Sequence, residues 1–552
     1  MKDIASWNEG DWIAAIAAVF LFAVLAIGGI IATRKSEEFA GHPRGLFVLF
    51  YAEMWERFSY YGMRALLVLY LAKFWLFTDG KSNLIYGAYT ALVYITPVLG
   101  GYIADRYLGQ RKAVFYGGVL LALGHLFMAV EGMHGVTDPA TKQADPAINV
   151  FWLALSLIIV GSGFLKANIL VIVGQLYRMT DVRRDAAYTI FYMGVNVGAA
   201  MGTILVGYLG ETIGWSWGFG LAGIGMVMGL IIFTLGKPAL RGNGEAPIPL
   251  SRNFEWTLYG IGLAAVVVIW LLVQYQSVIQ SLLIVSGIAM LVYTLYEAFK
   301  LPKEARERIF AILFLIALNP VFWGLFEQAG GSLSLYTDKY VDRGGVPTSL
   351  FQSINPIYIV LFAPMFAILW QYLGRKGMEP SAPAKFGYAL IQVGLSFLLF
   401  VWGADSVGPA ALTPVIFVFL IYLLQTTGEL CLSPVGLSAM TRLSPVHLGS
   451  FIMGAWFYMT AVGNFVAGKI GEATGGESGA MDKTLTLAIY NKIGWVTIVI
   501  AVVVLLLSPI VKRWMHIDTL EDREPGSDLA GQAEAGLDNQ EAGIHPALQP
   551  KA

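Results

Sequence analysis

An apolar run at 46–77 carries four charged side chains on one helix face, and this combination limits the possible folds more than any other feature. The run is long enough to span a bilayer. The spacing i, i+3, i+4, i+7, i+8, i+11 places six residues on one helix face: Glu53, Glu56, Arg57, Tyr60, Tyr61 and Arg64. A charged group facing lipid at the bilayer centre costs roughly 2.5–3.5 kcal/mol. The charged face must therefore line a bundle interior or a water-filled cavity.

The composition agrees with a membrane protein. The chain has 552 residues, of which 57% are hydrophobic and 13% charged, whereas soluble domains carry about 25% charged residues. The formal net charge of -1 gives no indication of nucleic-acid binding. The single cysteine, Cys431, has no partner for an intrachain disulfide, and we interpret it as a small core residue.

Long apolar segments recur along the whole chain and predict an all-α integral membrane protein. We expect fifteen spans, at about 12–32, 46–75, 83–105, 112–131, 148–178, 186–210, 215–237, 255–275, 277–299, 308–335, 350–373, 385–404, 411–440, 447–473 and 487–511. The first of these could instead be a signal peptide. Acidic residues before it, and no clear small-residue cleavage site before Arg34, favour a retained helix.

Twelve of the segments divide into two sets of six. They predict an N-terminal bundle at 46–237 and a C-terminal bundle at 308–512, separated at 238–307 by a linker and two inserted helices. Residues 1–45 add an extra helix with its cytoplasmic connection, and 513–552 form a polar tail whose composition predicts disorder. Two six-helix halves suggest the major facilitator fold, in which a substrate site lies between the halves near the bilayer midplane.

Basic residues alternate between connections and so predict the orientation. Six connections are rich in Lys and Arg, and they contain Arg44, Arg106, Arg178, Lys237, Lys300 and Arg375. The intervening stretch 132–147 has only Lys142, and 210–214 has no basic residue. By the positive-inside rule the basic connections are cytoplasmic. This places the N-terminus outside and the C-terminus in the cytoplasm.

A short motif after the second segment of the first bundle supports the fold. Residues 101–112 resemble the loop signature G-x-x-x-D-R-x-x-G-x-R-K of the major facilitator superfamily, through Gly101, Asp105, Arg106, Gly109 and Arg111. We expect Asp105 to cap a helix N-terminus and to pair with a basic neighbour. The motif indicates a superfamily and no substrate.

Three more charged residues lie well inside predicted spans. Lys166 is flanked by apolar turns and cannot easily reach either surface, so it needs a carboxylate partner or a bound anion. Glu327 and Glu429 are acids in the second half with the converse requirement. Each could belong to a structural ion pair, or to a pair that breaks and reforms during function.

Together these residues resemble the proton-dependent oligopeptide transporter family of the major facilitator superfamily, in its bacterial form. The specific block is E-x-x-E-R-F-x-Y-Y-G at 53–62, and four more blocks follow in family order at 161–166, 191–198, 322–328 and 428–438. Two positions depart from the family. Gly87 stands where animal members carry a histidine, and Ala167 stands where a proline is usual.

The resemblance implies a proton-coupled symporter that imports di- and tripeptides by alternating access. It implies a multi-pass protein of the bacterial inner membrane whose partners are peptides, protons and lipid, with no nucleic acid, no metal and no cofactor besides the proton. A monomer would be the functional unit. The substrate-binding residues carried over are Arg57, Tyr60, Tyr61, Tyr94, Lys166, Asn196, Trp323, Asn355, Glu429 and Trp456.

The same resemblance assigns proton coupling and gating. The proton-coupling residues are Glu53, Glu56, Arg57, Glu327 and Glu429, and the gate pairs are Arg64–Glu327 and Lys166–Glu429. Three alternatives stay open: a relative that moves another small anion, one that moves a drug-like solute, and a channel. An enzyme is least expected, because the chain has no H-E-x-x-H or G-x-S-x-G motif in a suitable context.

Overall fold

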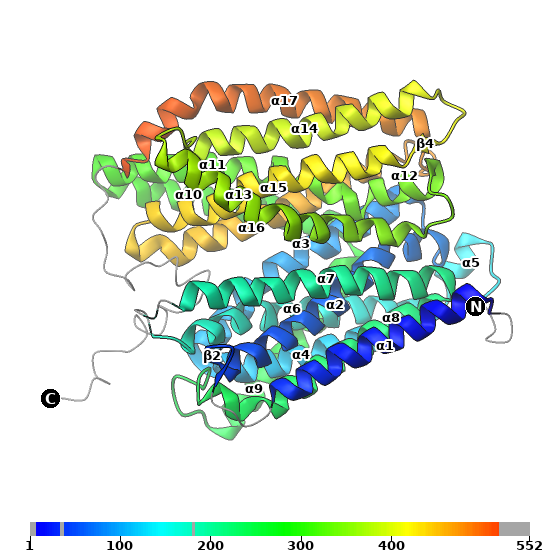
Figure 1. Ribbon diagram of the computed structural model, residues 1–552, viewed down its shortest axis with the longest axis horizontal. Coiled ribbons are helices and arrows are strands. Elements are labelled where there is room, and N and C mark those ends of the chain that lie inside the picture. Colours follow the sequence, from blue (N-terminus) through cyan, green and yellow to red (C-terminus); the bar gives the residue numbers. More distant parts are fainter. Residues whose placement is uncertain (1–6, 34–37, 179–180, 182, 518–552) are drawn as a thin grey trace.

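The computed structural model describes residues 7–33, 38–178, 181 and 183–517, and it consists of long helices in two bundles (Figure 1). The predicted polar tail beyond 517 and part of the first basic connection, at 34–37, lie outside the described residues. The helices are α1 (Glu9–Ala32), α2 (Arg44–Lys73), α3 (Asp79–Ile103), α4 (Gln110–Met128), α5 (Pro139–Gln143), α6 (Ala147–Gln175), α7 (Arg184–Thr212), α8 (Trp215–Leu235), α9 (Arg252–Gln274), α10 (Gln276–Lys300), α11 (Lys303–Phe326), α12 (Ser332–Tyr340), α13 (Ile354–Arg375), α14 (Ala382–Ser406), α15 (Ile416–Leu443), α16 (Gly449–Ala473) and α17 (Lys483–Trp514).

Strands are confined to two small pairs in the connections of the described chain. β1 (Glu38–Phe39) pairs with β2 (His42–Pro43) in antiparallel register. β3 (Val341–Asp342) pairs with β4 (Thr413–Pro414) in parallel.

The helices confirm an all-α membrane protein. Thirteen helical segments of the described chain are long and apolar enough to cross a bilayer. α2 and α4 also occupy predicted spans but fall outside that set. Their polar residues, among them the charged face of α2, lower their hydropathy. Such helices are tolerated where neighbouring helices cover them, and α2 is indeed buried along most of its length.

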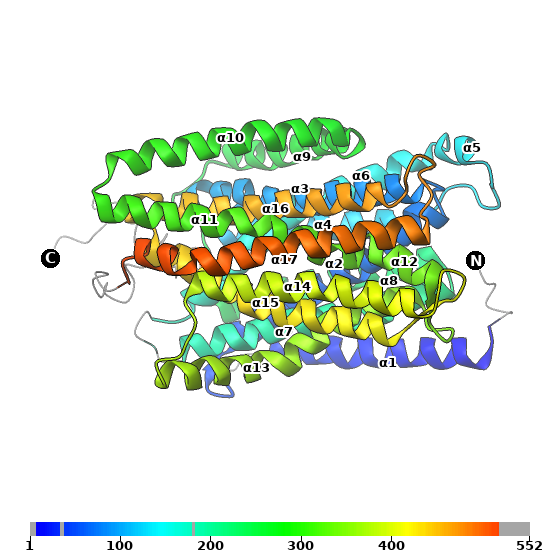
Figure 2. The ribbon, with the colours of Figure 1, turned by 90° about the horizontal axis from the view of Figure 1, so that it is seen from above.

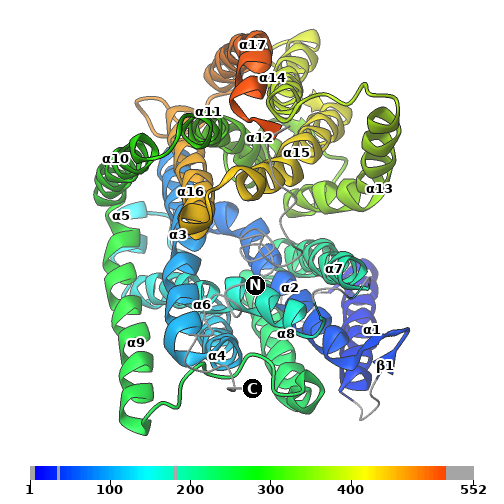
Figure 3. The same ribbon diagram turned by 90° about the vertical axis from the view of Figure 1, so that its left-hand side faces the viewer.

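The two bundles match the predicted halves of six helices. The first contains α2, α3, α4, α6, α7 and α8, and the second contains α11 and α13–α17 (Figure 3). The inserted pair lies along one side of both, with α9 against α6 and α10 against α11 (Figure 2). The extra helix α1 packs on α2, α7 and α8. α11 begins at Lys303, inside the segment assigned to the insertion, directly after Pro302.

One predicted helix is broken in the structure. The span expected at 308–335 ends as α11 at Phe326, passes through a 3₁₀ turn at Glu327–Gly330, and resumes as α12 at Ser332. Gly331 at the junction has φ -112° and ψ -112°, a non-helical conformation available to glycine. The apolar segment remains one candidate membrane span, Lys303–Tyr340, with the 3₁₀ turn inside it. The break places Glu327 at the end of α11, where its side chain stays buried.

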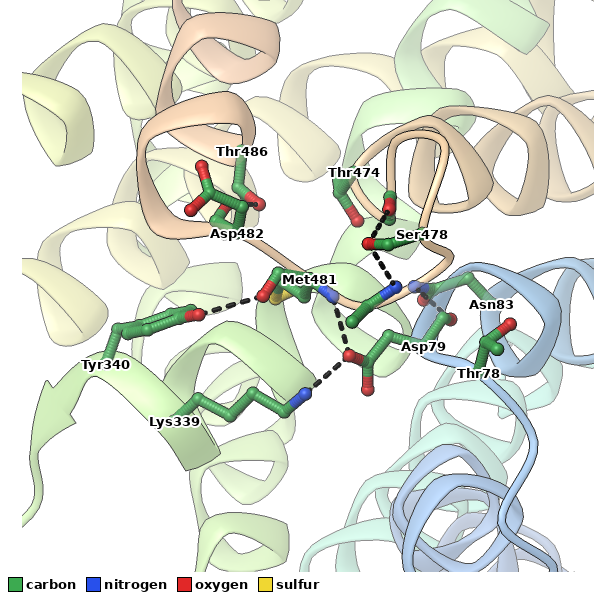
Figure 4. Close-up of polar contacts among 12 residues, drawn as sticks. Thr78, Asp79, Asn83, Lys339, Tyr340, Thr474, Ser478, Met481, Asp482 and Thr486 are labelled. Carbon is green, nitrogen blue, oxygen red and sulfur yellow. Dashed lines mark hydrogen bonds and ion pairs between the residues drawn. The ribbon is translucent and has the colours of Figure 1, made fainter. Parts of the chain in front are cut away.

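Polar contacts join the bundles at one end of the molecule, which we call the closed end. It carries the connections at 74–78, 341–353 and 474–482. There the Lys339 ammonium lies 2.5 Å from a carboxylate oxygen of Asp79, and the same oxygen accepts from the backbone N–H of Met481 at 2.7 Å (Figure 4). Lys73 and Asp338 form a second ion pair at 2.7 Å. The chain thus ties the two halves together at this end.

Candidate functional site

The charged face of α2 forms a buried cluster inside the first bundle. The exposed fractions of Glu53, Glu56 and Arg57 are 2%, 0% and 6%. Arg57 Nε lies 2.6 Å from Glu53 Oε1 and 3.0 Å from Glu56 Oε2. One guanidinium therefore serves two carboxylates, and the structure confirms that this face avoids lipid.

Some carboxylate oxygens of this cluster lack a hydrogen-bond donor in the described structure. Glu53 Oε2 and Glu56 Oε1 are buried and have no hydrogen-bond partner within the described residues. A buried ionised oxygen without a partner is costly. A proton or a donor group of a ligand would relieve that cost.

Lys166 of α6 completes the first-bundle side of the site. Its ammonium lies 4.2 Å from the ring centroid of Tyr94 and 5.3 Å from that of Tyr60, distances typical of cation–π contacts. In the part of the chain that the structure describes, Lys166 makes no ion pair with a carboxylate. It is therefore a half-buried cation available to an anionic ligand.

The second bundle presents an acid of its own. Asn355 Nδ2 of α13 donates to Glu429 Oε2 of α15 at 3.1 Å and to Thr426 Oγ1 at 3.0 Å. The predicted Lys166–Glu429 pair is not made between these described residues. Lys166 instead faces aromatic rings of its own bundle, while Glu429 is held by Asn355 on the other bundle.

A third set of residues connects the bundles. Arg64 Nη2 of α2 lies 2.5 Å from Glu327 Oε2 in the 3₁₀ turn after α11. Both side chains are buried, with exposed fractions of 8% and 3%. The predicted pair is thus present as a contact. Arg64 Nε also donates to the Tyr86 hydroxyl of α3 at 2.5 Å. Sequence reasoning missed Tyr86, because an apolar-flanked tyrosine on another helix carries no local signal of this contact.

The remaining predicted binding residues lie on both bundles. Tyr60 and Tyr61 pack edge to face, with ring centroids 5.2 Å apart. Asn196 Nδ2 donates to the Tyr192 carbonyl of its own helix at 3.0 Å. Trp456 is buried in the second bundle, and half-buried Trp323 has no hydrogen-bond partner for Nε1 among the described residues. No hydrogen bond in the described chain joins Asn196 or Trp456 to Glu429.

The superfamily motif has a structural role that differs from the expected cap. Gly109, not Asp105, is the N-cap of α4, and no side chain caps that end. Asp105 instead accepts from the side chain of Gln110 at 2.8 Å. Gly109 has φ +80°, and a Cβ there would lie 2.5 Å from the backbone nitrogen of Ala246. The prediction of a capping role was wrong because Asp105 lies inside a π-helical turn, Ala104–Leu108, that ends before the N-cap Gly109.

A cavity of about 530 Å³ lies elsewhere, between α10, α11 and α16. Its walls include Leu283, Gly287 and Tyr458, and it contains none of the predicted site residues. Because its lining is almost wholly apolar, it offers nothing to hold a charged solute.

Comparisons with known proteins show the family of this chain. A family model described as the POT family matches residues 111–479. The peptide transporter YePEPT of Yersinia enterocolitica is 36% identical over 515 residues, which is 88% of this chain and 97% of the relative. A di-/tripeptide transporter of Lactococcus lactis is 32% identical over 79% of this chain and 90% of its own.

Solved structures show the same fold. A peptide transporter POT in complex with sulfate has a TM-score of 0.74 and 32% identity, covering 90% of this chain and 99% of that one. A POT family transporter in complex with 5-aminolevulinic acid has a TM-score of 0.72 and 32% identity, covering 87% and 99%. With a family model over most of its length and relatives of this similarity, the chain belongs to the POT family of membrane transporters.

Proposed function

We propose that this protein is a proton-coupled symporter that imports di- and tripeptides across the bacterial inner membrane by alternating access. One observation carries the proposal: the two bundles present opposite charges, with Arg57 and Lys166 on the first and Glu429 on the second. A zwitterionic peptide carries an anion at one end and a cation at the other. The site complements both ends. The similarity to the peptide transporters of Yersinia and Lactococcus supports this interpretation.

The peptide carboxylate would meet Arg57 and Lys166, with Tyr61 beside them. The ammonium would meet Glu429, which Asn355 already orients by a hydrogen bond of 3.1 Å. Tyr60, Tyr94, Trp323, Asn196 and Trp456 would line the space for the peptide side chains. Aromatic walls accept side chains of varied shape through apolar contact.

A charge count explains why a proton accompanies the peptide. The candidate site has seven charged groups, Glu53, Glu56, Glu327, Glu429, Arg57, Arg64 and Lys166, so four negative and three positive charges leave a formal charge of -1. A zwitterion does not change this sum. One proton makes the occupied site neutral, and a neutral site can be enclosed between the bundles at the lowest electrostatic cost.

Glu53 and Glu56 are the natural acceptors for that proton. Two carboxylates share one guanidinium, and both have oxygen atoms without hydrogen-bond partners in the described structure. Protonation of either acid weakens its hold on Arg57. The guanidinium then becomes available to the peptide carboxylate, which couples proton uptake to peptide binding.

The arrangement of the bundles indicates which state of the transport cycle the structure represents. With the basic connections in the cytoplasm, the closed end faces the outside, because its connections are the ones poor in Lys and Arg. We therefore also call it the outer end. Residues Leu99 and Tyr102, near the opposite end of α3, have exposed fractions of 64% and 55%. We infer that the structure represents a cytoplasm-facing state. Import then requires the contacts between the bundles at the closed end to break and to form again in each cycle.

Uptake into liposomes tests the proposal. Purified protein is reconstituted, an inward proton gradient is imposed, and accumulation of labelled dialanine and trialanine is followed. We expect concentrative uptake that saturates, that collapses when the gradient is dissipated, and that unlabelled tripeptides inhibit but nitrate and free amino acids do not. Inhibition by nitrate alone would indicate an anion carrier, and conductance without saturation would indicate a channel.

A further inference from the structure

Tyr86 occupies a special position between the two bundles. Its hydroxyl accepts a hydrogen bond from Arg64 Nε at 2.5 Å and donates one to Glu327 Oε2 at 3.4 Å. Tyr86 is buried, with an exposed fraction of 1%. One neutral hydroxyl thus contacts both members of a buried ion pair.

The two bonds differ in what happens when the bundles separate. Tyr86 on α3 and Arg64 on α2 belong to the same bundle, so their hydrogen bond does not depend on the distance between bundles. Glu327 belongs to the other bundle, and its contacts with both residues are lost when the outer end opens. The guanidinium keeps one fixed partner in either arrangement.

The opposite bundle is shaped to receive this hydroxyl. A Cβ on Gly330, in the same turn as Glu327, would lie 1.9 Å from the Tyr86 oxygen. Only glycine leaves room for the hydroxyl there. The fit means that the Tyr86 ring meets the 3₁₀ turn each time the bundles come together.

We propose that Tyr86 is a positioning residue for the Arg64–Glu327 contact. Its hydroxyl holds the Arg64 guanidinium at the bundle surface, aimed at Glu327, so that the outer end closes onto a preformed donor. This inference rests on the proposed alternating-access function and adds a specific neutral residue to it. Without the hydroxyl, closure buries an Arg64 N–H that has lost its acceptor, whereas water satisfies that N–H when the end is open.

The Tyr86→Phe variant tests this inference because it removes only the hydroxyl. Loss of a hydrogen bond to a charged group corresponds to about a tenfold decrease in the closed-to-open ratio. The matched control is Tyr89→Phe, since Tyr89 lies one turn along the same helix, is fully buried, and its hydroxyl has no hydrogen-bond partner in the described chain. The control should behave as the wild type.

The ratio is measured by electron–electron distance spectroscopy in lipid nanodiscs. Spin labels are placed on cysteines introduced at two exposed sites on different bundles, Ala140 in α5 and Ala411 just before β4, in a Cys431→Ala background. Both α5 and β4 lie at the same end as α12, the closed end (Figure 1). We expect Tyr86→Phe to add a longer distance that Tyr89→Phe lacks. Identical distributions for the wild type and both variants would overturn the proposal.

A double mutant separates positioning from general packing. If Tyr86 acts through Arg64, then Tyr86→Phe has no further effect in an Arg64→Met background, whereas an undiminished effect there would also overturn the proposal. Should Tyr86→Phe not fold, Gly330→Ala displaces the hydroxyl from the other side and is expected to add the same longer distance, and an unchanged distribution for it would count against the proposal. Wild-type uptake, assayed in parallel, tests the transport function independently of these distances.

Discussion

Gly87 of α3 and Gly468 of α16 touch through their backbones, and this contact joins the two bundles below the closed end. A Cβ built on Gly87 would lie 2.5 Å from the Cα of Gly468 and 2.8 Å from its nitrogen. Nearby, Asn83 Nδ2 donates to the Gly471 carbonyl at 3.2 Å. Gly87 stands where animal members of the family carry a histidine, and in this arrangement a larger side chain has no room.

The first prediction concerns this glycine contact. Gly87→Ala inserts a methyl group where backbone lies, and overpacking of this kind costs about 1–3 kcal/mol. The cost falls only on the closed arrangement, because the helices separate when the outer end opens. We expect a slower maximal rate of gradient-driven dialanine uptake and a larger open fraction in the distance measurement. Gly260→Ala is the control, since no atom lies within 4 Å of its Cβ position, and an equal loss of uptake there would contradict the explanation.

The second prediction concerns the shared guanidinium. Glu56→Gln removes one of the two acids around Arg57, whose Nε lies 3.0 Å from Glu56 Oε2. The amide cannot take up the coupling proton, so uphill uptake driven by a proton gradient should be abolished. Exchange of internal for external peptide needs no net proton movement and should survive. The same two assays apply to Glu53→Gln, and full concentrative uptake by both variants would reject these acids as proton acceptors.

The third prediction concerns the peptide ammonium. Glu429→Gln replaces a half-buried carboxylate, held by Asn355 at 3.1 Å, with a neutral group. A charge-assisted hydrogen bond contributes about 1.5–3 kcal/mol, so we expect KM for dialanine to rise about tenfold or more. N-acetylated dialanine, which lacks the ammonium, should lose little additional affinity in this variant. Glu472→Gln, on a more exposed acid paired with Lys469, serves as the control and should leave KM unchanged.

The fourth prediction ranks the ion pairs that close the outer end. The Lys73 side chain is 41% exposed in its pair with Asp338, and such pairs contribute only about 0–1 kcal/mol. Lys73→Met should therefore change the open fraction far less than Arg64→Met, which leaves Glu327 buried without its cation. Raising the salt concentration should weaken the Lys73 contribution further. A larger change in the open fraction for Lys73→Met than for Arg64→Met would show that the burial of an ion pair does not determine how much it stabilises the closed arrangement.

The sequence predicted the elements of the fold well because bilayer physics acts on local composition. A span needs about 20 apolar residues, so the apolar segments indicated the helices, and the cost of exposing charge to lipid was enough to place the charged face of α2 inside a bundle. The adjacent glycines Gly330 and Gly331 indicate an interruption in this span. Hydropathy does not distinguish an α-helix from a 3₁₀ turn, so the turn at Glu327–Gly330 was not predicted.

Some contacts among the candidate site residues were predictable from the sequence, and others were not. Glu53, Glu56 and Arg57 lie within about one turn of a single helix, so their mutual contacts follow from helical geometry. Lys166 and Glu429 lie on different bundles, and their expected pair is not formed between these described residues. The distance between bundles varies through a transport cycle, and no local pattern records which state of that cycle the chain adopts.

By itself, then, the sequence determined a two-bundle membrane protein with acids and bases hidden from lipid, because the cost of exposing a charge to hydrocarbon is large and local. Only the tertiary structure decided which of those charges meet. Tyr86 and Glu327 come together across 241 positions of chain, and Gly87 meets Gly468 through backbone alone. Contacts between distant segments depend on how helices pack around one another, which the periodicity of any one helix does not encode.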